Sequence, residues 1–145
     1  MNDRILIVDD DPDDIAMLER FLSSDPVEIR GVTDSRQAQI AFDEFKPDLV
    51  LLDLHLPPPD GLAILRGLRN ARKSIGFVPV VVLTGDDRKA ARNSALVMGA
   101  DDFLTKPLDR HEVVFRVRNL LRTRKQYVDL EQANEDLRQE LYRPI

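Results

Sequence analysis

The sequence predicts one α/β domain with a flavodoxin-like, doubly wound sheet of five parallel strands, followed by a C-terminal helical extension. The main observation is that a short apolar run followed by an amphipathic segment occurs five times along the chain, a pattern typical of a parallel sheet covered by helices on both faces. The first, third and fourth runs are continuously apolar, as central strands are, whereas the second alternates as an edge strand does. These two features favour the strand order 2-1-3-4-5.

The strands and helix ends follow from local signals in the chain. Asp60 can cap the helix after the third strand, and a basic, glycine-containing turn at 72–76 is expected to end that helix. Asp86 and Asp87 are N-cap candidates for the next helix, which Gly99 should stop. The five strands are expected at residues 5–8, 27–32, 49–52, 78–83 and 102–105.

Composition limits the class of protein. A chain of 145 residues, 43% of them hydrophobic, can form one well-buried core and is short for two ordinary domains. It lacks cysteine, has no apolar run of membrane-spanning length and carries no signal-peptide pattern, so we expect a soluble cytoplasmic protein without disulfides. A net charge of -5 without a basic stripe argues against general nucleic-acid binding.

Polar residues stand at the carboxyl ends of four predicted strands. Asp9 and Asp10 follow the first strand, Asp53 the third, Thr84 the fourth and Lys106 the fifth, and ligands of such sheets bind at this edge. Clustered carboxylates repel one another unless a cation binds or one of them is protonated, and Mg²⁺ prefers oxygen ligands and often recruits a phosphate group. With a hydroxyl and an ammonium nearby, the set predicts a phosphoryl-transfer site in which Asp53 is the nucleophile.

The chain resembles the receiver domain of bacterial two-component response regulators across residues 3 to about 122. The matching motifs are ILIVDD, DLVLLDLHLPPPDG, VVVLTG and DDFLTKPL, which occur in the same order and on the same elements. No single motif is specific, but the set in register is. The resemblance divides the chain into a receiver domain, 1–122, and a helical extension or linker, 123–145.

The resemblance also implies roles for the polar residues at the strand ends. Asp53 would accept a phosphoryl group from a histidine kinase or phosphotransfer protein, with Mg²⁺ as cofactor. Asp10 would be a direct metal ligand, Asp9 would act through water, and the backbone carbonyl of His55 would be the third protein ligand. Histidine is unusual at that last position.

The remaining implied roles concern the response to phosphorylation. Thr84 and Phe103 would form the switch pair, and Lys106 would contact the phosphoryl oxygens. In the family the peptide bond between Lys106 and Pro107 is cis. The protein would then be a signalling switch that catalyses its own aspartyl phosphorylation and dephosphorylation, rather than an ordinary enzyme.

Two other functions fit the sequence less well, and some of the acidic residues have a simpler explanation. A hydrolase with an aspartyl nucleophile would need a second acid two residues after Asp53, where His55 stands, and a flavin-binding module would need a phosphate loop after the first strand. The other acids near the first helix are most simply charges that its dipole favours. These acids are Asp11, Asp13 and Asp14. We assign no role to His111.

The C-terminal extension carries a heptad pattern. Leu120, Tyr127, Asn134 and Leu141 recur every seven residues, and Thr123, Leu130 and Leu137 follow the first three of them by three positions, which is an a/d seam. We therefore expect the extension to continue the last helix and to pair with its copy in a parallel homodimer, with a solvated single helix as the alternative. In a longer parent protein it would carry the signal to an output domain, and it should not itself bind DNA.

Overall fold

A computed structural model of the chain describes residues 2–75, 77–85, 93–94, 96 and 98–143, with the side chains of 71–75 left out. The sheet contains five parallel strands in the order β2-β1-β3-β4-β5, which confirms the predicted topology. The elements in chain order are β1 (Asp3–Val8), α1 (Pro12–Phe21), β2 (Val27–Val32), the 3₁₀ turn η1 (Ser35–Gln37), α2 (Ala38–Phe45), β3 (Leu49–Asp53), α3 (Gly61–Ile75), β4 (Val80–Thr84), β5 (Asp102–Thr105) and α5 (Arg110–Leu141).

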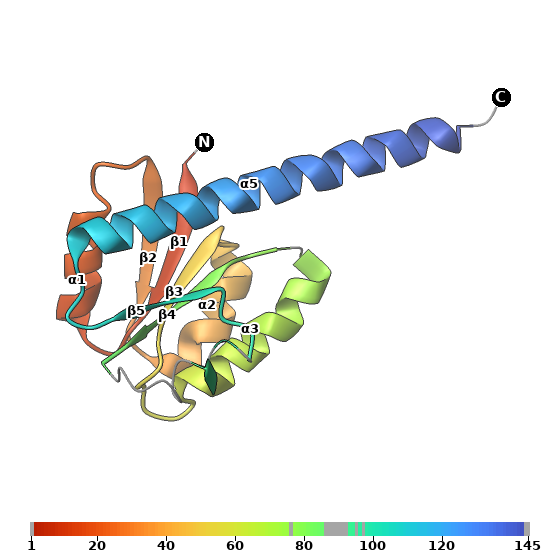
Figure 1. Ribbon diagram of the computed structural model, residues 1–145. Helices are drawn as coiled ribbons and strands as arrows, with labels where there is room; N and C mark the ends of the chain where they lie inside the picture. Colours follow the sequence, from red (N-terminus) through yellow and green to blue (C-terminus); the bar gives the residue numbers. More distant parts are fainter. Residues whose placement is uncertain (1, 76, 86–92, 95, 97, 144–145) are drawn as a thin grey trace.

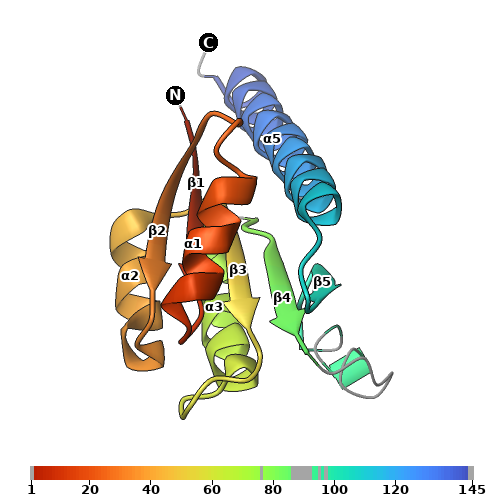
Figure 2. The ribbon, with the colours of Figure 1, turned by 90° about the vertical axis from the view of Figure 1, so that its left-hand side faces the viewer.

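Helices cover both faces of the sheet, and alternate strand residues supply the two halves of the core. α1 and α5 lie on one face, where Ile15, Leu18, Val113 and Val117 pack against strand residues such as Leu51 (Figures 1 and 2). α2 and α3 cover the other face and pack against the side chains that point the opposite way. Every residue of β3 and β4 is buried, as expected for central strands, whereas β2 alternates between half-buried and exposed positions at the edge.

Most of the predicted boundaries hold, with two corrections. β4 begins at Val80 rather than residue 78, because Pro79 has no N–H to donate to the neighbouring strand. The turn expected at 72–76 is wrong over most of its length, since α3 continues to Ile75 and residues 68–75 contain neither glycine nor proline. Asp60 caps α3 as predicted, accepting a hydrogen bond from the N–H of Ala63.

The loop and helix after β4 fall largely outside the part of the chain that can be described. The N-cap candidates Asp86 and Asp87 lie outside the described residues. Gly99, expected to stop this helix, has a φ of 111°, a conformation that glycine adopts at little cost and other residues avoid.

α5 is one continuous helix of 32 residues, which corresponds to a rod of about 48 Å. Only its first part is packed on the sheet, and the rest projects beyond the domain (Figure 1). Two contacts hold its middle: Arg124 forms an ion pair with Asp48 at 2.9 Å, and the rings of Tyr127 and Phe77 meet edge to face with centroids 5.5 Å apart. Within the described ranges, the helices all fall short of the length and apolarity that a membrane crossing requires.

Candidate acidic site at the carboxyl edge of the sheet

Neighbouring parallel strands bring the first two carboxylates together. Val8 of β1 is paired with Leu52 of β3, so the residues that follow, Asp9 and Asp53, emerge side by side at the same edge. Asp9 is fully buried and Asp53 is 4% exposed, while Asp10 faces solvent. Carboxylate oxygens of these three residues lie within 4.8 Å of one another. The predicted cluster is therefore present at the switch point of the sheet.

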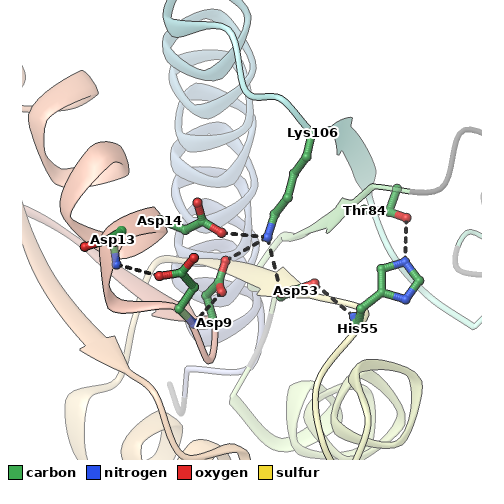
Figure 3. A network of polar contacts seen from close by, with 8 residues as sticks. Asp9, Asp13, Asp14, Asp53, His55, Thr84 and Lys106 are labelled. Carbon is green, nitrogen blue, oxygen red and sulfur yellow. Dashed lines mark hydrogen bonds and ion pairs between the residues drawn. The ribbon is translucent and has the colours of Figure 1, made fainter.

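Lys106 reaches across this cluster from the loop after β5. Its ammonium nitrogen Nζ lies 2.9 Å from Asp14 Oδ2, 3.1 Å from Asp9 Oδ2 and 3.3 Å from Asp53 Oδ2 (Figure 3). The Lys106 backbone N–H donates to the carbonyl of Thr84, which fixes the start of this loop against β4. The peptide bond between Lys106 and Pro107 is cis, as the resemblance implied.

Asp14 is the site residue that sequence reasoning missed. The sequence predicts a charge favoured by the helix dipole, whereas in the structure its carboxylate contacts Lys106. A signal was available in the sequence: Asp14 precedes Leu18 by four residues and Phe21 by seven, and such positions share one face of a helix. Because Leu18 packs on the sheet, Asp14, which lies one turn earlier on the same face, points toward the edge of the sheet. Asp11, by contrast, caps α1 by accepting the N–H of Asp13.

Burial and pairing determine the protonation of the cluster. Burial raises the pKa of Asp9 to about 6, against the lowering effects of the Asp11 N–H bond and the Lys106 charge. Burial alone would lower the pKa of Lys106, but the hydrogen bond to Asp14 and the charges of Asp53 and Asp9 outweigh it and raise that pKa. Lys106 therefore remains an ammonium at neutral pH, and the cluster contains one cation among several acids.

A second set of contacts joins Asp53 to the end of β4. The backbone N–H of His55 donates to Asp53 Oδ1 at 2.9 Å, and the ring nitrogen Nε2 of His55 lies 3.1 Å from the hydroxyl of Thr84 (Figure 3). Thr84 is fully buried although the His55 residue is exposed. The two oxygens of Asp53 thus have different partners, Oδ1 the His55 N–H and Oδ2 the Lys106 ammonium.

Phe103 lies on the same face of the sheet as Thr84. It pairs with Val82 in β4, two residues before Thr84, and side chains two positions apart in a strand share a face. Its side chain is partly buried against the core on the α2 and α3 face. Asp102 accepts hydrogen bonds from both the Phe103 N–H and the guanidinium of Arg116, at 2.8 and 2.7 Å. Phe103 is therefore linked to α5 through two polar contacts.

The donor set fits a small, hard dication. All three clustered side chains offer carboxylate oxygens, which Mg²⁺ prefers over nitrogen or sulfur. Their oxygens lie within 4.8 Å of one another, so the three residues could contribute to the shell of one ion, directly or through water. The site therefore places the buried Asp53 carboxylate beside one fixed cation, the Lys106 ammonium, and offers oxygen ligands for a second.

Comparison with known proteins matches the chain to response regulators, the family that its sequence motifs resemble. A family model described as a response regulator receiver domain matches residues 5–118. The transcriptional regulatory protein TrcR of Mycobacterium tuberculosis is 38% identical over 119 residues, which are 82% of this chain and 45% of that protein. The DNA-binding response regulator MtrA of Mycolicibacterium smegmatis is 41% identical over 122 residues, or 84% of this chain and 52% of that one. The chain thus spans about half the length of the curated relatives it matches.

Solved structures also resemble the chain. NtrX of Brucella abortus is 31% identical with a TM-score of 0.80, and the match covers 96% of this chain and 31% of NtrX. The receiver domain of the Francisella response regulator 1452 is 26% identical with a TM-score of 0.76, and the match covers 84% of this chain and 98% of that one. The NtrX match therefore extends further along this chain than the Francisella match does.

Proposed function

This chain belongs to the response regulator receiver domain family, and on that premise we propose that Asp53 accepts a phosphoryl group from the phosphohistidine of a histidine kinase or phosphotransfer protein. The observation that carries the proposal is the environment of Asp53, whose Oδ2 faces the Lys106 ammonium at 3.3 Å while Oδ1 is held by the His55 N–H at 2.9 Å. A carboxylate oriented in this way is a competent nucleophile beside a cation that can attract phosphoryl oxygens.

In the transfer, an O–P bond forms at Asp53 as the N–P bond of the donor phosphohistidine breaks, and the donor, protonated on its other ring nitrogen, leaves as neutral imidazole. Lys106 stabilises the charge on the moving phosphoryl oxygens. Mg²⁺ would be held by Asp10 and Asp53 directly, by the His55 carbonyl, and by Asp9 through water. When bound, the ion neutralises charge on the carboxylates and the phosphoryl group, which would otherwise repel each other.

The switch would operate through Thr84 and Phe103. A phosphoryl group on Asp53 brings new acceptor oxygens to the site, and the Thr84 hydroxyl would turn toward them from its contact with His55 Nε2. The movement would open space for the partly buried Phe103 ring. Asp102 joins the Phe103 backbone to Arg116 of α5. A shift of Phe103 would therefore change the position of α5 or its contact with Asp102.

The extension, 123–145, would serve as the output of the switch. Leu130, Leu137 and Leu141 are 62%, 59% and 73% exposed, which supports burial against a second copy in a homodimer through this helix. The seam is shorter than the heptads suggest, because Leu120 packs on the core and Tyr127 on Phe77. We place the protein in the cytoplasm, with a histidine kinase or phosphotransfer protein as its partner and no direct contact with nucleic acid.

Mass spectrometry after incubation with acetyl phosphate and Mg²⁺ tests the phosphoacceptor. Wild type should gain one phosphoryl group and Asp53→Asn none, because the variant lacks the nucleophilic oxygen. Asp48→Asn is the matched control, since Asp48 is an aspartate paired with Arg124 away from the cluster. Equal labelling of wild type and Asp53→Asn would contradict the proposal.

A further inference from the structure

We propose that Asp14 is a positioning residue, which holds the Lys106 ammonium in the resting protein and competes with the phosphoryl group for it. The proposal rests on the function proposed for Asp53 and concerns a residue to which the receiver resemblance gives no role. Its starting point is the contact between Asp14 Oδ2 and Lys106 Nζ, which at 2.9 Å is the shortest of the three that this ammonium makes to carboxylates.

The three contacts account for all the hydrogen bonds that Lys106 can donate. An ammonium has three N–H donors and no acceptor, and Asp9, Asp14 and Asp53 take one each. A new acceptor can therefore be served only if one of these bonds is given up or shared. The bond to Asp53 can pass to one oxygen of a phosphoryl group on that side chain, but a second phosphoryl oxygen needs another donor. Because the contact with Asp9 is buried, the bond to Asp14 is the one that can be exchanged.

The setting of Asp14 supports an exchange of this kind. Its side chain is 26% exposed and that of Lys106 25%, whereas Asp9 is fully enclosed. Water can replace Lys106 at Asp14 at little cost, but it cannot do so at Asp9. Asp14 also belongs to α1 while Lys106 follows β5, so the ion pair ties two separate elements across the mouth of the cluster (Figure 3).

The direction of the effect follows from competition. A phosphoryl group on Asp53 carries about -1.5 to -2 charges and three acceptor oxygens, and its stabilisation by Lys106 requires the ammonium to leave Asp14 at least in part. Asp14 therefore favours the resting state. Neutralising it should increase the affinity of the site for a phosphoryl mimic without removing any group that touches that mimic.

The test is isothermal titration calorimetry, which measures the dissociation constant of beryllium fluoride in saturating Mg²⁺. Asp14→Asn and Asp14→Ala should bind this phosphoryl mimic about two- to fivefold more tightly than wild type, as expected from loss of a partly exposed ion pair. Asp14→Glu keeps the charge and can still reach Lys106, so it should restore an affinity close to wild type.

Asp13→Asn provides the matched control. Asp13 is the adjacent residue of the same helical turn and carries the same charge, but it is exposed and lies outside the Lys106 contacts. If Asp13→Asn tightened binding as much as Asp14→Asn, the effect would be a general reduction of negative charge, and the proposal would fail. The ¹³Cε chemical shift of Lys106 in the resting protein should change in Asp14→Asn and remain unchanged in Asp13→Asn.

The two proposals can fail separately. Loss of labelling at Asp53 is measured by mass spectrometry and does not depend on Asp14. If wild type is phosphorylated on Asp53 but the Asp14 variants bind beryllium fluoride as wild type does, only the role of Asp14 is overturned. If Asp53→Asn is labelled as well as wild type, the proposed function itself falls.

Discussion

The cluster around Lys106 and the distal half of α5, residues 129–141, use the same charged residue types in opposite settings. In the cluster, Asp9 and Asp53 are enclosed by the fold and share one ammonium. In the distal half, the pair Arg138 and Glu135 is 3.5 Å apart with side chains 68% and 50% exposed. Water screens the second pair and leaves it worth under about 1 kcal/mol, whereas breaking the first leaves buried charge without a partner.

The comparison also separates two ways in which a sequence specifies structure. The cluster exists because three strands and α1 place side chains from distant parts of the chain within hydrogen-bonding distance. The distal half of α5 is helical through local preference and i,i+4 contacts such as Gln132 with Asp136 at 2.9 Å. Substitutions should therefore have large, pH-dependent effects on stability in the first region and small ones in the second.

The largest effect is expected from Lys106→Met. It leaves the carboxylates of Asp9 and Asp53 without their shared cation, and at pH 8 without divalent cations this should lower the free energy of unfolding by about 3 kcal/mol. Urea denaturation measures the change. Arg138→Met in the distal half is the control and should cost less than about 0.5 kcal/mol. Similar losses in both variants would show that the two regions do not differ as described.

Asp9→Asn should act in the opposite sense. Burial raises the pKa of Asp9 from 3.8 to about 6 in the folded protein, so the folded state binds this proton more tightly than the unfolded state does. The resulting stabilisation is complete below about pH 4 and is lost as the pH rises through 6. At pH 8 without Mg²⁺, Asp9→Asn should be more stable than wild type by about 2 kcal/mol.

The same comparison at pH 4 is the internal control for Asp9→Asn, since both proteins then carry a neutral group at this position and should differ little. Asp136→Asn, in the distal half, should change the unfolding free energy by less than about 0.5 kcal/mol at either pH. An Asp9→Asn protein that is less stable than wild type at pH 8 would mean that its bond to Lys106 outweighs the cost of burial.

Mg²⁺ should stabilise the folded protein through the same cluster. At ten times its dissociation constant, an ion that binds only the folded state adds about 1.4 kcal/mol. Thermal melts with and without Mg²⁺ should show this gain for wild type and a smaller one for Asp10→Asn, which lacks a clustered carboxylate. An Asp10→Asn protein that gains as much as wild type would rule out this residue as a ligand.

The smallest effect on stability is expected from removing the distal half of α5. A chain that ends at Val128 keeps the contacts of Arg124 and Tyr127 with the domain, so its unfolding free energy should remain within about 0.5 kcal/mol of the full chain in monomeric conditions. Light scattering should show a dimer for the full chain and a monomer for the shortened one. A full chain that stays monomeric at high micromolar concentration, with and without a phosphoryl mimic, would exclude the homodimer.

The fold and most of the cluster could be predicted because they depend on signals that are local in the sequence. Continuous apolar runs identify buried strands, and Asp9, Asp53 and Thr84 stand where those runs end. Parallel topology then requires these ends to meet. The same reasoning could not fix the start of β4 at Val80, which depends on how Pro79 meets its neighbour, or the length of α3.

What escaped prediction depends on which way a helix faces. The contact of Asp14 with Lys106 joins residues 92 positions apart, and charge at a helix N-terminus has a sufficient local explanation. The heptad pattern of α5 had the same weakness. Tyr127 fits an a position, but its ring meets Phe77 of its own domain, and a periodicity alone does not say which surface a stripe will cover.

The contact between Tyr127 and Phe77 also gives α5 the geometry of a lever arm. The domain supports the helix here, near the middle of its length. Phe77 lies just before β4, the strand that ends at Thr84. From Tyr127 to Leu141 the helix extends about 21 Å, so a tilt of 10° at this support would move its end by about 4 Å. A probe attached near the end of α5 would therefore magnify a rearrangement too small to detect at the site itself.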